Sequence, residues 1–279
     1  MHMADTREAP APAVDGDDAP VVVFDNVSIS FDQNEVLKNI SFKVAPGETR
    51  ILLGPAGVGK SVLLKLANGL MCPDSGSIHV FGEEVSSMRE EDLFALRDRI
   101  GMVFQEGALF DSLKVRDNVA YRLIEERVPQ AEIDTRVMEA LRFVELEQAV
   151  DKLPSQISGG MRRRVAIARA IVSRPDLLLY DSPTGGLDPI TSTTIVELIV
   201  KQRDVYRTSS LLVTHRLQDA FTLAMHRFDR EQNKMELLPR GEVDASTTFL
   251  ILQEGKLIFD GSTHDLIHSD DPFIRNYLT

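Results

Sequence analysis

The chain has 279 residues, of which 43% are hydrophobic and 27% are charged, and its net charge is −12. These values are ordinary for a globular protein with one large or two small domains. The acidic balance argues against binding nucleic acid or anionic lipid through bulk electrostatics, and no run of 18 apolar residues predicts a membrane span.

The first 20 residues are rich in Ala, Pro and Asp, with five acidic side chains and one arginine. Such a segment buries too little surface to order itself, so a disordered tail is predicted for residues 1–20. The tail lacks the basic and apolar regions of a signal peptide. The single cysteine, Cys72, has no internal partner for a disulfide, which favours a reducing, cytosolic location.

Beyond the tail, short β-rich runs alternate with segments of helical periodicity. Two continuous apolar runs, 177–180 and 211–213, are typical of central parallel strands buried on both faces. Strands separated by helices predict an α/β fold with a parallel sheet. The other predicted strands are 21–31, 36–44, 50–53, 77–81, 100–104, 249–253 and 256–260; the predicted helices are 61–67, 89–99, 115–126, 131–146, 161–172 and one after His215. The charged stretch of about 226–248 is interpreted as an insertion.

One glycine-rich loop lies between a predicted strand and a predicted helix. It has the form G-x-x-x-x-G-K-[ST] and consists of Gly54, Pro55, Ala56, Gly57, Val58, Gly59, Lys60 and Ser61. In such a P-loop the backbone N–H groups and the helix N-terminus hold phosphate oxygens. Lys60 is expected to reach the β- and γ-phosphates, and the Ser61 hydroxyl to bind Mg²⁺. The alternative is a glycine-rich turn without a ligand.

Two further features extend this nucleotide-site hypothesis. Asp181 ends a buried apolar run, where a carboxylate can belong to the magnesium shell, or can simply cap a turn. The turn Ser158, Gly159 and Gly160 opens another helix, and an open helix N-terminus is a second anion site. Two phosphate-binding helix ends in one chain suggest that a nucleotide is sandwiched between two copies.

With these motifs in this order, residues 21–270 resemble the ATP-binding subunits of ABC transporters. The resemblance implies a P-loop NTPase core in one domain, 21–279, with an N-terminal antiparallel β subdomain and an inserted helical subdomain at about 86–160. It implies that Phe31 stacks on adenine, that Gln105 senses Mg²⁺ and the γ-phosphate, and that Ser158, Gly159 and Gly160 contact the partner's ATP. It also implies that Asp181 binds Mg²⁺, that Asp188 lies in the D-loop and that His215 is the switch histidine.

One position departs from that family. Its catalytic glutamate follows the aspartate, and here that position is Ser182. Serine is a far weaker base than a carboxylate. Three readings stay open: slow hydrolysis with Ser182 and His215 holding water, another carboxylate acting instead, or ATP binding without appreciable hydrolysis. An engineered substitution is a further possibility.

Two stretches, 104–113 and 186–192, are similar to the Mla-type phospholipid-transport ATPases of bacteria and their chloroplast relatives. The resemblance implies an ATP- and Mg²⁺-dependent homodimer on the cytoplasmic face of the inner membrane. It also implies a separate membrane permease, a small regulatory subunit and a lipid-binding protein. Leu109, Phe110 and Leu113 are either core residues or a socket for the permease. The alternatives are an ATP-gated clamp and an ABC subunit for another solute. ABC proteins of translation usually carry two cassettes on one chain, and those of DNA repair carry a long coiled coil. The sequence shows neither pattern, which argues against both classes.

Overall fold

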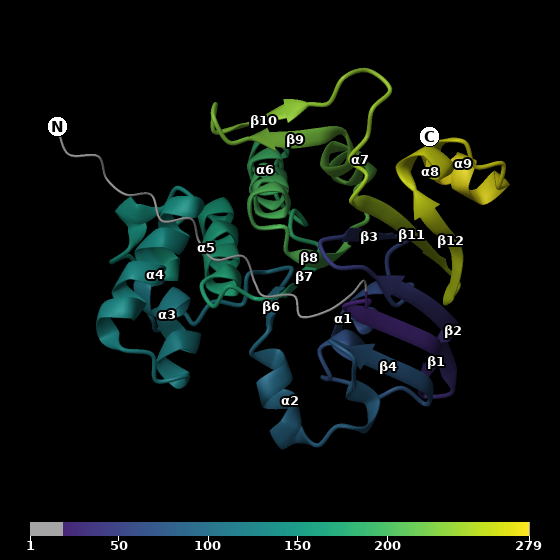
Figure 1. Cartoon of the computed structure of the whole chain (residues 1–279), viewed down its shortest axis with the longest axis horizontal. Coiled ribbons are helices and arrows are strands. Elements are labelled where there is room, and N and C mark those ends of the chain that lie inside the picture. Colours follow the sequence, from purple (N-terminus) through teal and green to yellow (C-terminus); the bar gives the residue numbers. More distant parts are fainter. Residues whose placement is uncertain (1–18, 279) are drawn as a thin grey trace.

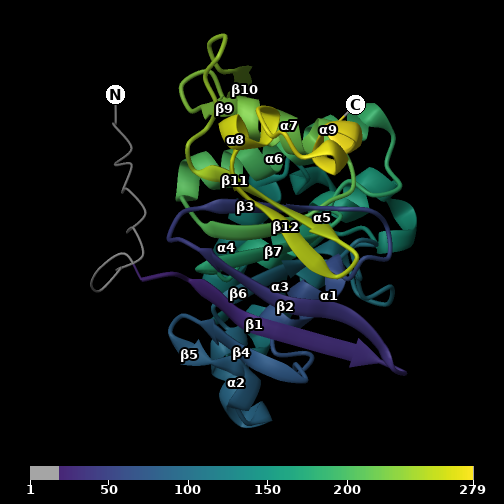
Figure 2. The same ribbon diagram turned by 90° about the vertical axis from the view of Figure 1, so that its right-hand side faces the viewer.

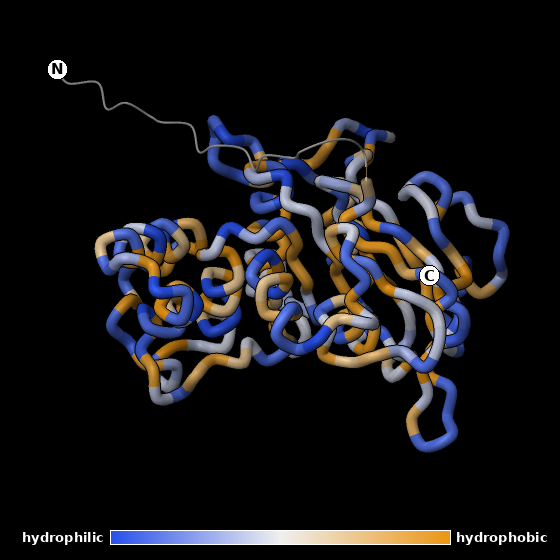
Figure 3. The backbone as a smooth tube through the Cα atoms, turned by 60° about the horizontal axis from the view of Figure 1, so that its bottom comes forward, coloured by the Kyte–Doolittle hydropathy of each residue, from blue (hydrophilic) through white to orange (hydrophobic). Residues whose placement is uncertain are grey.

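The computed structural model describes residues 19–278. Except for Ala19 and Pro20, the predicted tail of residues 1–20 therefore lies outside the described residues. Figure 1 shows strands at the centre and on one side of the molecule and a lobe of helices on the other side, and Figure 2 shows the molecule from the side of the strands. Figure 3 shows that apolar segments concentrate inside and polar segments on the outer loops. In residues 19–278 no helix combines the length and the apolar character that crossing a membrane requires.

The first strands form an antiparallel sheet of four strands, in the order β2-β1-β4-β5. Side chains alternate between buried and exposed along β1, as expected for a sheet with one face on the core. On the buried face, the rings of Phe24 and Phe42 stack with their centroids 4.6 Å apart. The predicted N-terminal β subdomain is therefore confirmed. Its strands are β1 Val22–Phe31, β2 Asn34–Val44, β4 Ser75–Val80 and β5 Glu83–Glu84.

The second sheet has six strands in the order β12-β11-β3-β8-β7-β6. All neighbouring strands are parallel except β11 and β12. Every residue of β3 and β8 is buried, which explains why these strands read as continuous rather than alternating apolar runs. The strands are β3 Thr49–Leu53, β6 Ile100–Val103, β7 Leu177–Asp181, β8 Ser209–Val213, β11 Thr247–Gln253 and β12 Lys256–Ser262.

This sheet separates two hydrophobic cores. In β3, Ile51 and Leu53 face one core while Leu52 faces the other, because successive side chains of a strand point to opposite faces. The core around Leu52 includes α1 and the N-terminal sheet, and the core around Ile51 includes α5 and α6. Helices α1 and α5 thus lie on opposite faces of the six-stranded sheet.

The helices divide into those that cover this sheet and those that form the lobe. Helices α3, α4 and α5 pack against one another in the lobe at the left of Figure 1. The predicted helical range of about 86–160 also includes β6, which is a strand of the six-stranded sheet. The helices are α1 Lys60–Ala67, α2 Glu90–Arg97, α3 Val115–Glu125, α4 Gln130–Phe143, α5 Gly159–Ile171, α6 Pro189–Tyr206, α7 Leu217–Met225, α8 Thr263–Ile267 and α9 Pro272–Leu278, with short 3₁₀ turns at Val85–Ser87, Glu147–Ala149 and Pro154–Gln156.

The charged stretch of about 226–248 contains an antiparallel hairpin, β9 His226–Asp229 and β10 Lys234–Leu237. It packs on α6, and Phe228 is buried in the core beneath it. The Lys201 ammonium lies 5.1 Å from the ring centroid of Phe228 and 4.9 Å from that of Phe143. The hairpin is therefore joined to both α6 and the end of α4.

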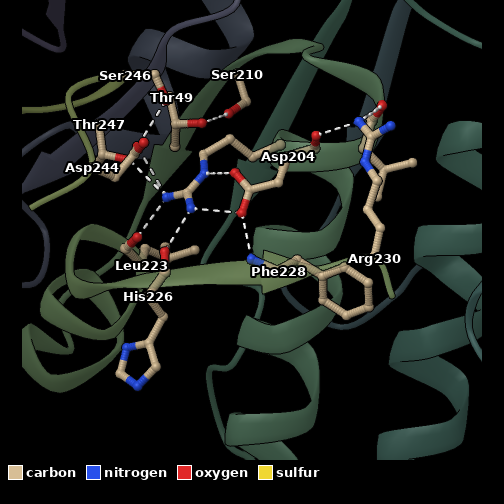
Figure 4. A network of polar contacts seen from close by, with 12 residues as sticks. Thr49, Asp204, Ser210, Leu223, His226, Phe228, Arg230, Asp244, Ser246 and Thr247 are labelled. Atoms are coloured by element: carbon tan, nitrogen blue, oxygen red, sulfur yellow. Dashed lines mark hydrogen bonds and ion pairs between the residues drawn. The ribbon is translucent and has the colours of Figure 1, made fainter. Parts of the chain in front are cut away.

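Arg203, a buried arginine, anchors both ends of this stretch, and Figure 4 labels its partners Asp204, Leu223, His226 and Asp244. The Arg203 side chain, 3% exposed, forms ion pairs with Asp204 at 2.6 Å and with Asp244 at 3.1 Å. It also donates hydrogen bonds to the carbonyl oxygens of Leu223 at 2.6 Å and His226 at 2.7 Å. Because buried charges are stable only when paired, this network fixes where the hairpin leaves and rejoins the domain.

Candidate nucleotide site

The predicted site residues follow four neighbouring parallel strands at the edge where those strands end. The P-loop follows β3, Gln105 follows β6, Ser182 follows β7 and His215 follows β8. The register aligns these ends, since Asp181 pairs with Val213 across β7 and β8. In open α/β sheets, ligands bind in the crevice outside the carboxyl ends of the strands.

The P-loop has a backbone conformation that requires glycine at two positions. Gly54 has φ +151°, and a Cβ there would lie 2.4 Å from the carbonyl oxygen of Leu252 in β11. Gly59 has φ +106° and caps the N-terminus of α1. The first N–H groups of a helix have no partner within it, so this turn presents donors to an anion.

Lys60 is the first residue of α1, and it is only 7% exposed. Its ammonium donates to the carbonyl oxygens of Gly54 at 2.8 Å and Pro55 at 2.6 Å. Burial lowers the pKa of Lys60 below its usual 10.5, and the nearby Asp181 carboxylate opposes that shift. The side chain thus folds back across the loop that would surround a phosphate.

Ser61 and Asp181 form the oxygen pair at the centre of the site. The Ser61 hydroxyl donates to Oδ1 of Asp181 at 3.0 Å. Among residues 19–278 no cluster of three or more His, Cys, Asp or Glu side chains could hold a metal alone. A hydroxyl and a single carboxylate nevertheless suit Mg²⁺, which usually takes one or two carboxylates and completes its shell with water and substrate phosphates.

Ser182 follows Asp181 in a constrained conformation. Its φ is +46°, uncommon for a residue other than glycine, and the residue is 7% exposed. The Ser182 N–H donates to the carbonyl oxygen of Val213 at 2.8 Å, which ties this residue to β8. Gln105 and His215 flank Ser182 on the loops after β6 and β8, and both are exposed.

The helix that begins with Gly159 and Gly160 is capped by Ser158. The Ser158 hydroxyl accepts a hydrogen bond from the Met161 N–H at 3.2 Å, as expected for an N-cap serine. A Cβ at Gly160 would lie 2.4 Å from the Thr191 methyl group in α6. The glycine therefore permits the close approach of α5 and α6.

Asp188 caps α6 in the same manner. Its carboxylate accepts from the Thr191 N–H at 3.0 Å and from the Thr191 hydroxyl at 2.6 Å. These two bonds are the main reason why the pKa of Asp188 is lowered. Asp188 is thus a helix cap, placed next to the turn that carries Ser158.

Phe31 ends β1 and is 39% exposed. It is joined to the P-loop through the hairpin of β1 and β2, because a Cβ at Gly59 would contact Val36 at 3.0 Å and Leu37 at 2.9 Å in β2. An exposed aromatic ring on this hairpin is available for stacking on a base.

The structure does not bring all the predicted residues together within one chain. The P-loop begins α1 on one face of the six-stranded sheet, whereas Ser158 begins α5, which packs on the other face. One chain therefore presents two separate helix N-termini, at the starts of α1 and α5.

Sequence reasoning missed three side chains at the site. Arg163 and Arg216 donate to main-chain carbonyl oxygens of the segment after Asp181. The Tyr277 hydroxyl of α9 accepts a hydrogen bond from the Gly54 N–H at 3.2 Å. For Arg163 the signal was the run of three arginines, 162–164, at the start of α5, because a buried cation must find partners; nothing in the sequence marked Arg216 or Tyr277.

Comparisons with known proteins point to one family. The ABC transporter family model matches residues 37–185. The chain is 37% identical to the chloroplastic protein TRIGALACTOSYLDIACYLGLYCEROL 3 of Arabidopsis thaliana, with 90% of this chain and 71% of that protein covered. It is 34% identical to the intermembrane phospholipid transport system ATP-binding protein MlaF of Escherichia coli, with 93% and 89% covered.

Another relative acts on a different solute. The chain is 36% identical to the methionine import ATP-binding protein MetN 2 of Bacillus cereus, with 92% of this chain and 72% of that protein covered. Among solved structures, it is similar to the dimeric, post-hydrolysis ATP-binding cassette MJ0796 bound to ADP and Pi. The TM-score is 0.72 at 27% identity, with 86% of this chain and 98% of that chain covered.

Proposed function

Because this chain belongs to the ABC transporter ATP-binding family, whose members bind and hydrolyse ATP, we propose that it powers phospholipid transport through a separate membrane permease. The observation that carries the ATP site is the hydrogen bond between Ser61 and Asp181, beside the buried Lys60. Backbone N–H groups that can donate hydrogen bonds to phosphate, the Lys60 ammonium, and the oxygen ligands of Ser61 and Asp181 converge there.

The residues divide the work at this site. Lys60 and the N-terminus of α1 bind phosphate oxygens, and the exposed ring of Phe31 stacks on the base. Ser61, Asp181 and Gln105 hold Mg²⁺, which supplies charge neutralisation at the phosphates when bound. Ser182 and His215 orient water near the γ-phosphate, with no carboxylate at position 182 to accept its proton.

Two copies complete the site. The P-loop and Ser158 are on helices packed against opposite faces of the sheet. ATP therefore lies between the P-loop of one copy and the Ser158–Gly160 turn of the other, with Asp188 at the shared surface. The dimeric state of the similar cassette bound to ADP and Pi supports this arrangement.

The permease docks on a groove beside Gln105. This groove has a volume of about 300 Å³ and lies between β6, α3 and α5, with Phe110, Tyr121 and Arg169 among its lining residues. The rings of Phe110 and Tyr121 are 42% and 41% exposed and their centroids are 4.6 Å apart. Leu109 instead packs on the core, so only part of the predicted socket is open.

Phospholipid is favoured over methionine by the greater coverage of the phospholipid transport relative, 89% against 72%. The transporter then acts at the inner membrane, with this subunit on its cytoplasmic face and with a small regulatory subunit and a lipid-binding protein as further partners.

A transport assay with the complete complex, purified from its host through a tag on this subunit, tests which substrate is moved. In proteoliposomes with ATP, movement of a fluorescent phospholipid that is lost in Lys60→Ala supports the proposal. ATP-dependent methionine uptake without phospholipid movement would replace it with the importer reading.

A second candidate function follows from Ser182. With a weak base beside Asp181, the subunit could act as an ATP-gated clamp that closes on ATP without appreciable hydrolysis. ATP-dependent dimerisation with no phosphate release in the complete complex would favour that function.

A further inference from the structure

The segment of residues 182–187, here termed the linking loop, joins Asp181 to the cap of α6 at Asp188. Its first four residues are buried, so its polar main-chain groups need internal partners. Within the loop the Gly185 N–H donates to the Ser182 carbonyl oxygen at 2.9 Å, and the Leu187 N–H to that of Thr184 at 3.1 Å. Four of its carbonyl oxygens also accept hydrogen bonds from arginine side chains.

Arg163 reaches the loop from α5. Its guanidinium donates to the carbonyl oxygens of Ser182 at 3.3 Å and Gly185 at 3.2 Å. The same group donates to the carbonyl oxygen of Phe104 at 3.3 Å, one residue before Gln105. Arg163 is 5% exposed, and its charge interacts with the Glu106 carboxylate. One side chain of the helical lobe therefore joins the loops that carry Ser182 and Gln105.

Arg216 holds the other half of the loop from the segment after β8. Its Nη1 lies 3.4 Å from the carbonyl oxygens of both Thr184 and Leu187, and 2.7 Å from the Ser192 hydroxyl in α6. The Arg216 side chain also pairs with Asp219 at 3.4 Å, and Asp219 in turn accepts a hydrogen bond from the Thr184 hydroxyl. Since Arg216 follows His215 directly, this half of the loop is tied to the switch position.

We propose that Arg163 and Arg216 are positioning residues that form a two-arginine clamp on the linking loop, and that Arg163 makes the position of Ser182 follow the position of α5. The proposal rests on the proposed ATP hydrolysis. Since Ser158 caps α5 and faces the partner's nucleotide in the proposed dimer, closure of that dimer moves Ser182 and Gln105 together with α5. The planar guanidinium allows this, because Nη1 donates to Phe104 and Ser182 while Nη2 donates to Gly185, whereas a lysine ammonium carries all its donors on one nitrogen and lacks that fixed fork.

The decisive variant is Arg163→Lys, which keeps the charge and removes the fork. Its matched control is Arg164→Lys, since Arg164 lies on the same helix and donates to the carbonyl oxygen of Val144 at 3.1 Å, away from the loop. In the complete transporter complex, Arg163→Lys should lower kcat by about 10- to 100-fold, because small misplacements of reacting groups have effects of that size. The KM for ATP should stay within about twofold, since neither the P-loop nor Phe31 is touched.

Two readouts separate positioning from a structural role. Amide hydrogen exchange of residues 182–187 should accelerate in Arg163→Lys and Arg216→Lys, while that of β8 stays unchanged. In a Ser182→Ala background the kcat effect of Arg163→Lys should shrink, because the two residues act through one loop. The clamp would be overturned if Arg163→Lys and Arg164→Lys had equal kcat and equal exchange of residues 182–187. It would also be overturned if the kcat effects of Arg163→Lys and Ser182→Ala were additive.

The exchange measurement also separates this inference from the proposed function. If the wild-type complex binds Mg-ATP without releasing phosphate, ATP hydrolysis is refuted. The amide exchange measurement then decides alone whether the two arginines clamp the linking loop. Faster exchange of residues 182–187 in Arg163→Lys, both with and without Mg-ATP, then supports the clamp. Unchanged exchange in both states refutes it.

Discussion

The Ser61 hydroxyl donates a hydrogen bond to Oδ1 of Asp181 at 3.0 Å, although 120 positions separate the two residues along the chain. The contact joins the first turn of α1 to the end of β7, and thus connects the phosphate-binding loop to the carboxylate. It is formed across the sheet edge on which β3, β8 and β7 end side by side. The first four predictions below depend on the nucleotide site that this contact organises.

Replacing Lys60 by alanine should weaken Mg-ATP binding at least about tenfold, since a hydrogen bond to a charged group contributes about 1.5–3 kcal/mol. Titration calorimetry measures the effect. Lys65→Ala is the matched control, because Lys65 is an exposed residue of the same helix. An unchanged affinity in folded Lys60→Ala would refute the P-loop assignment.

The lowered pKa of Lys60 predicts proton uptake when ATP binds. Burial lowers this pKa below 10.5 in the free protein. At alkaline pH a fraction of the molecules therefore carry Lys60 as the neutral amine. Phosphate anions favour the charged form and raise the pKa, so the complex binds more protons than the free protein. Calorimetry in buffers of different ionisation enthalpy should show proton uptake that increases as the pH rises toward the lowered pKa of Lys60 in the free protein. The uptake should be lost in Lys60→Met and kept in Lys65→Ala; proton release on binding would contradict the assignment.

Ser158→Arg should abolish the ATP-dependent dimer. The substitution removes the N-cap of α5 and places a bulky side chain against the partner's γ-phosphate. Sedimentation velocity in Mg-ATP should show a dimer for the wild type, which ADP does not support, and a monomer for the variant. Ser87→Arg, on an exposed 3₁₀ turn of the N-terminal subdomain, is the control. A dimer that ignores both nucleotide and Ser158→Arg would disprove the sandwich.

Ser182→Glu should raise ATP turnover by at least about tenfold, because general-base catalysis typically contributes about 10²–10⁴-fold. The positive φ adds no new strain, since both residues carry a Cβ. Phosphate release by the complete complex is the measurement, with Ser182→Ala as the control. If Ser182→Glu has no effect while His215→Ala eliminates turnover, water is activated by other groups and Ser182 is not limiting.

Arg203→Leu should lower the free energy of unfolding by about 3–5 kcal/mol, because removing one member of a buried ion pair leaves the other charges unpaired. Here the unpaired groups are Asp204 and Asp244. Urea denaturation followed by circular dichroism measures the change. Arg227→Ala on the same hairpin is the control, since its side chain is 61% exposed and lies 4.0 Å from Glu236. Equal losses in the two variants would show that the anchor is not specific.

The sequence was most informative where one strong local pattern determines one structure. The apolar runs at β7 and β8 and the glycines of the P-loop predicted both the sheet and the loop after β3. These patterns are local, because burial on both faces selects a continuous apolar strand and positive φ selects glycine.

Long-range polar contacts could not be predicted in this way. The hairpin of β9 and β10 has few apolar residues, and its place depends on Arg203, whose partners come from three separate segments. Arg163 likewise lies in a run of three arginines, and nothing local distinguishes the one that reaches Ser182 from its neighbours. Which carbonyl oxygens a buried cation meets depends on tertiary packing alone.

The location of α1 and α5 on opposite faces of the six-stranded sheet has a genetic consequence. In the proposed dimer, one Lys60→Ala chain paired with one Ser158→Arg chain has both defects in one nucleotide site and neither in the other. Two alleles that are each inactive alone therefore contain, between them, all the parts of one intact site. If ATP binds between two copies as proposed, coexpression of the two alleles should restore a function that neither allele supplies, whereas two different P-loop alleles should not complement each other.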